Sequence, residues 1–362
     1  MKLRQTAGLA VPLVMASVLL AACSSSGSST SSSSAGTSSS SASSSSGSSA
    51  AGSLKKGLKV YVIPKNLGNS YFTTADSVKT DGALAALGTL GEKGTETSGT
   101  AATPASQLPV IQSSIAKGAN ALIISADDPL ALCPTLKSAA AKGVTVVTYD
   151  SDAPTCRSIY VENAPAQSIG ESEVVDMAKE LGAAGGQVAI VSAAASATNQ
   201  NTWIGYMKTE LKKYPKLDLV STVYGNDDPT TATQVTQGLL QKYPKLKGII
   251  SPTTVGILAA AEVIDKAKDI GKVLLTGLGT PLEMKSYIEN GTSPDVILWN
   301  PARTGYIAAY AAVELASKAI TDATGQTFTA GSFGKETIGP DGTIDPGGTT
   351  TFTKANVNQF HF

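Results

Sequence analysis

The chain has 362 residues, in which 28 Lys and Arg residues balance 28 Asp and Glu residues, so its formal net charge is zero. This balance argues against a nucleic-acid partner, which an excess of Lys and Arg would indicate. His361 is the only histidine and lies next to the C-terminus, so we expect no Ser-His-Asp triad, no His–carboxylate zinc site and no cofactor.

The first 23 residues have the order of regions found in a secretory signal peptide. Lys2 and Arg4 precede an apolar core from Leu9 to Leu20 that is too short to span a bilayer. The following Ala-Ala-Cys23 resembles the lipobox of bacterial lipoproteins, whose Cys is lipidated. An ordinary signal peptide with a chance Cys is the alternative. We expect residues 1–23 to be a lipoprotein signal peptide that is lipidated at Cys23, and the protein to be extracytoplasmic and held at the cell membrane.

From Ser24 to Ser53 the chain consists almost entirely of Ser, with Gly, Ala and Thr. Such a segment has no apolar surface to offset the entropy lost on ordering, so we expect residues 24–56 to form a flexible tether. The tether would hold a folded body near the membrane and leave it free to turn.

From Lys59 onward, short apolar runs alternate with stretches of helical periodicity. Leu108, Ile111 and Ile115, for example, are spaced as on one face of a helix. Strands that alternate with helices of this length predict right-handed βαβ units and parallel sheets, and hence an α/β fold. The predicted strands are Lys59–Ile63, Ala121–Ser125, Thr145–Tyr149, Val188–Ser192, Leu217–Val223, Gly248–Ser251, Val273–Gly277 and Val296–Leu298.

This alternating body is longer than one sheet comfortably holds, so we expect two α/β lobes. No linker rich in Pro, Gly or Ser divides its middle, which indicates that the chain crosses between lobes at strand-like segments near Tyr149–Ile159 and Trp299–Ala302. We therefore assign residues 57–155 and 301–335 to the first lobe, and residues 156–300 and 336–362 to the second.

The first predicted strand ends at Pro64 and opens into a loop rich in polar and aromatic side chains. An ammonium group, two amides and two aromatic rings follow within a few residues: Lys65, Asn66, Asn69, Tyr71 and Phe72. Ligands of open parallel sheets bind outside the carboxyl ends of the strands, and these groups suit a small polyhydroxylated ligand. This loop is the first part of the predicted binding site.

Carboxylates follow two further predicted strands. Asp150 and Asp152 are two apart at a strand end and so point the same way, and Asp127 and Asp128 follow the strand before them. Ionised carboxylates accept hydrogen bonds from sugar hydroxyls or form the acid/base pair of a glycosidase, and spacing alone leaves both open. Asp128 precedes Pro129 and is expected to cap a helix. Asp127, Asp150 and Asp152 remain as candidate binding residues.

A polar segment also follows the predicted strand that ends at Ser192. After a run of small residues it offers the donors and acceptors of Asn199 and Gln200 and the flat ring of Trp203. We expect these side chains to contact the ligand. The alternative is that the segment only caps the next helix.

Two later strand ends add to the predicted site. Pro252, Thr253 and Thr254 follow one strand and suit backbone and hydroxyl contacts with a ligand. Asn300 ends another strand at a predicted crossing and is expected to face the cleft. We expect its neighbour Trp299 to lie in the core.

Cys133 and Cys156 remain once Cys23 is assigned to lipid. In an exported protein two such residues most simply form one disulfide, which would constrain the unfolded chain by about 3 kcal/mol. Two unrelated buried thiols are the alternative.

The residues from about Lys59 to the C-terminus resemble the sugar-type periplasmic solute-binding proteins of ABC importers, which share the type I, ribose-binding fold. Within this class, four segments resemble the rhamnose-binding proteins: Ser192–Ile204, Pro252–Ile257, Thr276–Gly279 and Ile297–Pro301.

A sister family binds the signalling furanose autoinducer-2. Its ligand set resembles Lys65, Asp150, Gln200 and Pro252, and the cysteine pair also looks like that family. The chain departs from it at Asn199, where the sister family carries Asp, and at Thr254, where it carries Ala. The resemblance therefore favours rhamnose over autoinducer-2.

The resemblance implies two Rossmann-like lobes joined by a hinge. The lobes close on one sugar without transforming it, and membrane subunits of an ABC permease then dock on the closed form. Charged and amide groups would replace water around the sugar hydroxyls, while rings such as Tyr71, Phe72 and Trp203 cover the apolar sugar face. We expect the protein to act as a monomer.

Other functions remain open at this stage. An exported glycoside-processing enzyme would use the carboxylates instead of only binding with them. A ligand-loaded sensor that docks on a receptor has the same sequence features as a transport protein. A transcription regulator of this fold is disfavoured, because the signal and tether occupy the place of a helix-turn-helix.

Overall fold

The structure, a computed structural model, describes residues 53–362. The predicted signal peptide, the predicted lipidation at Cys23 and nearly all of the predicted tether lie outside the described residues. Within residues 53–362, no helix combines the length and the apolar composition that a membrane span needs.

The first lobe is built on a six-stranded sheet with the order β13-β5-β4-β3-β1-β2, in which all neighbouring strands are parallel. A parallel sheet is normally covered on both faces, and the central strand β3, which reads Ala-Leu-Ile-Ile, is accordingly apolar and buried throughout. The strands are β1 (Lys59–Ile63), β2 (Lys93–Glu96), β3 (Ala121–Ile124), β4 (Thr145–Tyr149), β5 (Ile159–Val161) and β13 (Thr343–Ile344).

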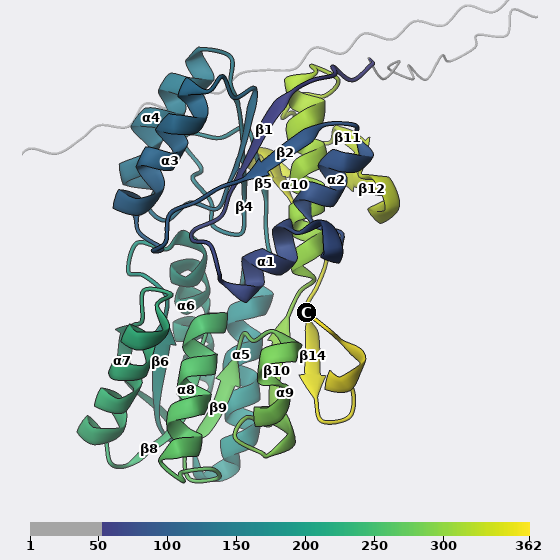
Figure 1. Ribbon diagram of the computed structural model, residues 1–362. Coiled ribbons are helices and arrows are strands. Elements are labelled where there is room, and N and C mark those ends of the chain that lie inside the picture. The colour runs from purple at the N-terminus through teal and green to yellow at the C-terminus, as the bar shows by residue number, and fades with distance from the viewer. Residues whose placement is uncertain (1–52) are drawn as a thin grey trace, which may run out of the picture. The chain divides into compact units, whose positions relative to one another are not determined.

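Helices cover both faces of this sheet (Figure 1). Helices α3 (Pro104–Ala116) and α4 (Pro129–Ala141) lie on one face, and α2 (Ala83–Thr89) and α10 (Pro301–Ala316) lie on the other. Successive side chains of a strand point to opposite faces, so Val62 joins the core on the α10 side and Ile63 joins the core under α3 and α4. The short helix α1 (Ser70–Asp76) follows β1 and packs against α10.

The second lobe is built on a four-stranded parallel sheet with the order β7-β6-β8-β9. Its strands are β6 (Gly186–Ser192), β7 (Leu217–Tyr224), β8 (Leu246–Ser251) and β9 (Leu274–Gly277). Two pairs of helices cover it, α5 (Ala166–Leu181) with α6 (Thr198–Glu210), and α7 (Pro229–Lys242) with α8 (Thr254–Lys266).

Smaller elements complete the two lobes. In the second, β10 (Asp295–Leu298) pairs antiparallel with β14 (Thr350–Thr353), and α9 (Pro281–Glu289) packs against β10. In the first, β11 (Thr327–Thr329) and β12 (Lys335–Thr337) form an antiparallel hairpin.

The architecture confirms the predicted α/β class with two lobes and parallel sheets. Each strand predicted from an apolar run is present, and the limits of Lys59–Ile63 and Thr145–Tyr149 are those of β1 and β4. The sequence missed β2, which reads Lys-Gly-Thr-Glu and has no apolar run, because it lies at the sheet edge. It also missed β5 and β13, which have 3 and 2 residues and are too short to show a period.

These short strands move the lobe boundaries away from the predicted ones. Because β5 and β13 pair within the first sheet, the boundaries at residues 155/156 and 335/336 were placed too early. The described chain passes between the lobes at residues 162–165, 299–300 and 345–349. The predicted crossing near Trp299–Ala302 is therefore in place, whereas the one near Tyr149–Ile159 was wrong, because that segment still contributes β5 to the first sheet.

Candidate functional site

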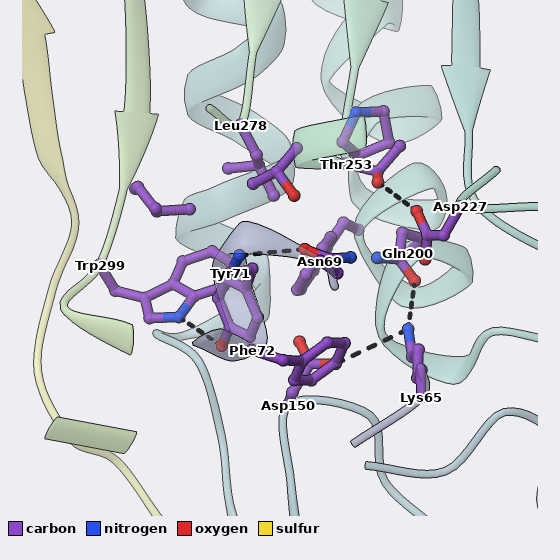
Figure 2. Close-up of a pocket in the computed structure, with 14 residues that line it drawn as sticks. Lys65, Asn69, Tyr71, Phe72, Asp150, Gln200, Asp227, Thr253, Leu278 and Trp299 are labelled. Atoms are coloured by element: carbon purple, nitrogen blue, oxygen red, sulfur yellow. Dashed lines mark hydrogen bonds and ion pairs between the residues drawn. The ribbon is translucent and has the colours of Figure 1, made fainter. Parts of the chain in front are cut away.

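A cavity lies between the carboxyl ends of the two sheets, with walls from both lobes (Figure 2), and its empty space is about 330 Å³ including the part open to solvent. Its polar lining is unevenly charged, with one ammonium group facing carboxylates, and its remaining lining is aromatic or aliphatic. The lining residues are Lys65, Asn69, Tyr71, Phe72, Asp150, Gln200, Trp203, Asp227, Pro252, Thr253, Thr254, Leu278, Leu298 and Trp299.

The loop after β1 places its polar groups through the start of α1. Asn69 is the N-cap of α1, and its Oδ1 accepts a hydrogen bond from the backbone N–H of Tyr71 at 3.0 Å. Because that oxygen is engaged in capping, the Asn69 amide nitrogen is the group left to donate into the cavity. The cap also fixes the first turn of α1, which directs Tyr71 and Phe72 into the cavity wall.

Lys65 is 3% exposed and lies where the two lobes meet. Its Nζ lies 3.7 Å from Oδ2 of Asp150 in the first lobe. The same Nζ donates to Oδ1 of Asn199 and to Oε1 of Gln200 in the second lobe, each at 3.4 Å. Since a buried ammonium is costly without partners, these contacts explain why the charge is tolerated there.

Asp150 is held by donors from several elements. Its Oδ1 accepts from the side-chain amides of Asn163 at 2.9 Å and Asn199 at 3.1 Å, and its Oδ2 accepts from the Ser125 hydroxyl at 2.7 Å. Its backbone has a φ of 59°, in the left-handed region, which Asp tolerates better than most residues. The strain is consistent with a site where the direction of one carboxylate matters.

The second lobe contributes the first turns of α6. Gln200 and Trp203 line the cavity, and Asn199 lies beside it and contacts Lys65 and Asp150. The predicted alternative, a segment that only caps its helix, does not describe these residues, because Asn199 and Gln200 are each 5% exposed and bond across to the first lobe.

Asp227 is a cavity residue that the sequence analysis missed. It follows β7, has a φ of 48°, and accepts a hydrogen bond from the Thr253 hydroxyl. Burial raises the pKa of its carboxyl, and the Lys65 ammonium opposes that rise. A signal was available, since Asp227-Asp228-Pro229 repeats the pattern of Asp127-Asp128-Pro129 after a strand.

In both copies of this Asp-Asp-Pro pattern the second Asp caps a helix and the first is buried. Asp128 caps α4 and Asp228 caps α7, as the sequence predicts for Asp128. Asp127 is 3% exposed, and neither of its carboxylate oxygens has a hydrogen-bond partner among the described residues. The pKa of Asp127 is raised to about 8. Burial is the main cause, the Lys65 ammonium opposes the rise, and the Asp227 carboxyl adds to it. Asp127 is thus close to the site without lining the cavity.

The structure does not bring Asp152, Asn66 and Asn300 into the cavity. Asp152 forms an ion pair with Arg157 at 3.0 Å and accepts from the Thr148 hydroxyl, so the prediction that it shares a site with Asp150 was wrong. The left-handed turn at Asp150 breaks the simple alternation on which that prediction depended. Asn300 is exposed and caps α10, so its predicted position facing the cleft was also wrong.

Aromatic side chains form one side of the cavity. Trp299 packs against Tyr71 and Trp203, with ring centroids 5.9 and 5.6 Å apart, and its Nε1 donates to the Tyr71 hydroxyl at 2.9 Å. Trp299 is both buried and part of the cavity wall, so the expectation of a purely core position was incomplete. Leu278 and Leu298, also missed from sequence, extend this apolar wall.

The end of β8 completes the second-lobe wall. Pro252, Thr253 and Thr254 line the cavity where α8 begins, in the position that the sequence predicts. Across the opening, the Ser70 hydroxyl of α1 donates to Glu283 of α9 at 2.6 Å, which is a further contact between the lobes.

Cys133 and Cys156 form the predicted disulfide, which joins α4 to the loop after β4. Two unrelated thiols are thereby excluded. Among the side chains of residues 53–362, no group of His, Cys, Asp and Glu is arranged to hold a metal ion.

Comparisons with known proteins agree with this geometry. The sequence profile of the periplasmic binding protein domain matches residues 60–319. The crystal structure of an ABC transporter solute-binding protein from Clostridium phytofermentas with bound L-rhamnose is similar to this chain, with 34% identity and a TM-score of 0.80. The similarity covers 85% of this chain and 99% of that chain.

Two further relatives are more distant. LsrB from Clostridium saccharobutylicum in complex with AI-2 is similar with 26% identity and a TM-score of 0.78, over 84% of this chain and 100% of that chain. The D-allose-binding periplasmic protein of Escherichia coli (strain K12) is 26% identical over 147 residues, which are 41% of this chain and 46% of that protein. The chain therefore matches about half the length of this curated relative.

Proposed function

This chain belongs to the periplasmic binding protein domain family, and on that premise we propose that it captures a single neutral monosaccharide between its lobes and delivers it to an ABC permease. The observation that carries the proposal is the cavity between the lobes, at which hydrogen-bonding side chains from both lobes meet an aromatic wall. Since members of this family bind solutes and are not enzymes, the glycoside-processing alternative is set aside.

The size of the cavity limits the ligand. The empty space among its lining side chains is about 330 Å³ including the part open to solvent, which supports one monosaccharide and not an oligosaccharide. Lys65 and the amides of Asn69 and Gln200 supply donors, while Asp150 and Asp227 supply acceptors. A sugar hydroxyl both donates and accepts, so a neutral polyol satisfies this mixed set better than an anion, which the carboxylates would repel.

We propose L-rhamnose as the first candidate ligand. Its methyl group needs an apolar contact, and Leu278, Leu298 and Trp299 form an apolar wall of suitable character. The similarity to a solute-binding protein with bound L-rhamnose supports the same ligand class.

Autoinducer-2 is the second candidate, because LsrB in complex with AI-2 is also similar and the disulfide matches that family in the sequence comparison above. The residue Asn199 argues against autoinducer-2 as the ligand. Its amide donates to Asp150 at 3.1 Å, and the Asp that the autoinducer-2 family carries there would place a second carboxylate against the first.

The proposal includes anchoring and partners. The family is extracytoplasmic, and lipidation at Cys23 would hold the folded body at the membrane as a monomer, within reach of the permease.

A ligand screen on residues 53–362 tests the proposal. These residues contain both sheets and both hydrophobic cores. The solved solute-binding protein with bound L-rhamnose spans a similar stretch, since 85% of this chain matches 99% of that chain. We expect L-rhamnose to raise the thermal midpoint and to titrate calorimetrically with one site per chain. Stabilisation by autoinducer-2 alone would favour the second candidate. If neither compound nor any other deoxy sugar or pentose binds, the proposed function is wrong.

A further inference from the structure

Tyr71 lines the ligand cavity, and its hydroxyl is bonded to two of the segments that join the lobes. Tyr71 lies on α1, is 5% exposed and lines the cavity. Its oxygen accepts one hydrogen bond from Nε1 of Trp299 at 2.9 Å and another from Nδ2 of Asn163 at 3.3 Å. Figure 2 shows the bond from Trp299 beside the cavity. Trp299 belongs to the crossing at residues 299–300 and Asn163 to the crossing at residues 162–165.

The direction of both hydrogen bonds is fixed by chemistry. An indole N–H only donates. The Asn163 amide nitrogen also donates to Oδ1 of Asp150 at 2.9 Å. Exchanging the amide nitrogen and oxygen would turn an oxygen towards a carboxylate, so Asn163 must present N–H to Tyr71.

Two incoming N–H groups leave the phenol with its own proton to donate. Burial, and then the nearby Asp150 charge, raise the pKa of Tyr71 well above its ordinary value, so the hydroxyl keeps that proton. Among residues 53–362, none accepts a hydrogen bond from it. A buried hydroxyl proton without an acceptor is unfavourable, and a ligand in the cavity would supply the acceptor.

We propose that Tyr71 is a specificity-determining residue that donates its hydroxyl proton to an oxygen of the bound sugar, and that Asn163 and Trp299 position it for this role. The inference rests on the proposed function and deepens it. The ligand atom opposite Tyr71 must be an acceptor, such as a hydroxyl or ring oxygen. Because the positioning donors belong to two crossings, a change in either crossing turns the hydroxyl, and binding is thereby coupled to the relative position of the lobes.

Tyr71→Phe tests the proposal, since it removes only the hydroxyl and keeps the ring. Tyr149→Phe is the matched control. Tyr149 is equally buried and donates to Asp76 at 2.9 Å, but it does not line the cavity. The titrants are L-rhamnose, its monodeoxy analogues, each lacking one hydroxyl, and its carbocyclic analogue, in which a methylene replaces the ring oxygen.

We expect Tyr71→Phe to bind L-rhamnose about tenfold more weakly, and Tyr149→Phe to bind it as the wild type does. The wild type should bind one analogue more weakly than L-rhamnose, whereas Tyr71→Phe should bind that analogue and L-rhamnose with nearly the same affinity. The oxygen that this analogue lacks is then the partner of the Tyr71 hydroxyl. Asn163→Ala should also weaken binding while retaining selectivity against that analogue.

The failure of the Tyr71 assignment and the failure of the proposed function give different results. If the wild type binds L-rhamnose and Tyr71→Phe binds it equally well, or if every analogue loses the same factor in both proteins, the assignment of Tyr71 is overturned while the proposed function stands. If the wild type binds no sugar, the proposed function falls and the assignment of Tyr71 falls with it.

Discussion

Replacement of Asp150 by Asn changes the hydrogen-bonding balance at the centre of the site without changing its size. Oδ1 of Asp150 accepts from two side-chain amides, and Oδ2 accepts from Ser125 and faces Lys65 at 3.7 Å. If the new NH₂ group takes the place of Oδ1, it meets two amide donors, and if it takes the place of Oδ2, it faces the Lys65 ammonium beside the Ser125 hydroxyl. Lys65 also loses its ionic partner.

The expected magnitude follows from these contacts. Removing one member of a buried ion pair costs about 3–5 kcal/mol, and each donor left unsatisfied costs about 1–3 kcal/mol. Structural relaxation recovers part of this cost. If the ligand-bound protein is destabilised by about 3 kcal/mol more than the free protein, the affinity for the sugar falls roughly a hundredfold. Isothermal titration of Asp150→Asn with L-rhamnose measures it.

Asp152→Asn is the matched control, because it makes the same change two residues away. Asp152 pairs with Arg157 and does not line the cavity, so this variant should lose stability yet retain the affinity for the sugar. The reasoning is refuted if Asp150→Asn binds the sugar as tightly as the wild type, or if Asp152→Asn loses affinity to the same extent.

Two further predictions concern stability. Because the folded-state pKa of Asp127 is raised to about 8, its contribution to stability is fully present below its ordinary pKa of about 4 and is lost as the pH rises through about 8. Asp127→Asn should therefore reduce the slope with which the free energy of unfolding in urea falls between those pH values, and an unchanged slope would contradict the assignment. The paired change Cys133→Ala and Cys156→Ala should lower the free energy of unfolding by about 3 kcal/mol, since the disulfide closes a loop with a sequence separation of 23. Guanidinium unfolding with and without reductant checks this, because reductant should affect only the wild type.

Much of the fold follows from local sequence features. The short apolar runs that the sequence analysis assigned to strands correspond to strands, and the helix cap at Asp128 follows from the Pro after it. What local patterns miss are strands stabilised by their neighbours. β5 has 3 residues and β13 has 2, and they become visible only through their pairing, which is why the lobe boundaries were misplaced.

In the site, too, local sequence features predict some residues, and only the tertiary structure shows the others. Polar residues in the segments that follow apolar strands, such as Lys65 and Gln200, line the cavity because parallel strands end at one edge. Asp152 and Asn300 also follow strands, but an ion pair and a helix cap engage them elsewhere. Trp299 was assigned to the core since an aromatic ring beside a buried strand is usually core, and only tertiary structure shows that it also borders a cavity.

The most direct test of the account is a crystal structure of residues 53–362 grown with L-rhamnose. The account predicts density for one sugar between Lys65, Asp150 and Gln200, with its apolar side against Trp299 and one of its oxygens within hydrogen-bonding distance of the Tyr71 hydroxyl. Sugar density at any other place on the protein, with this cavity empty, would contradict it.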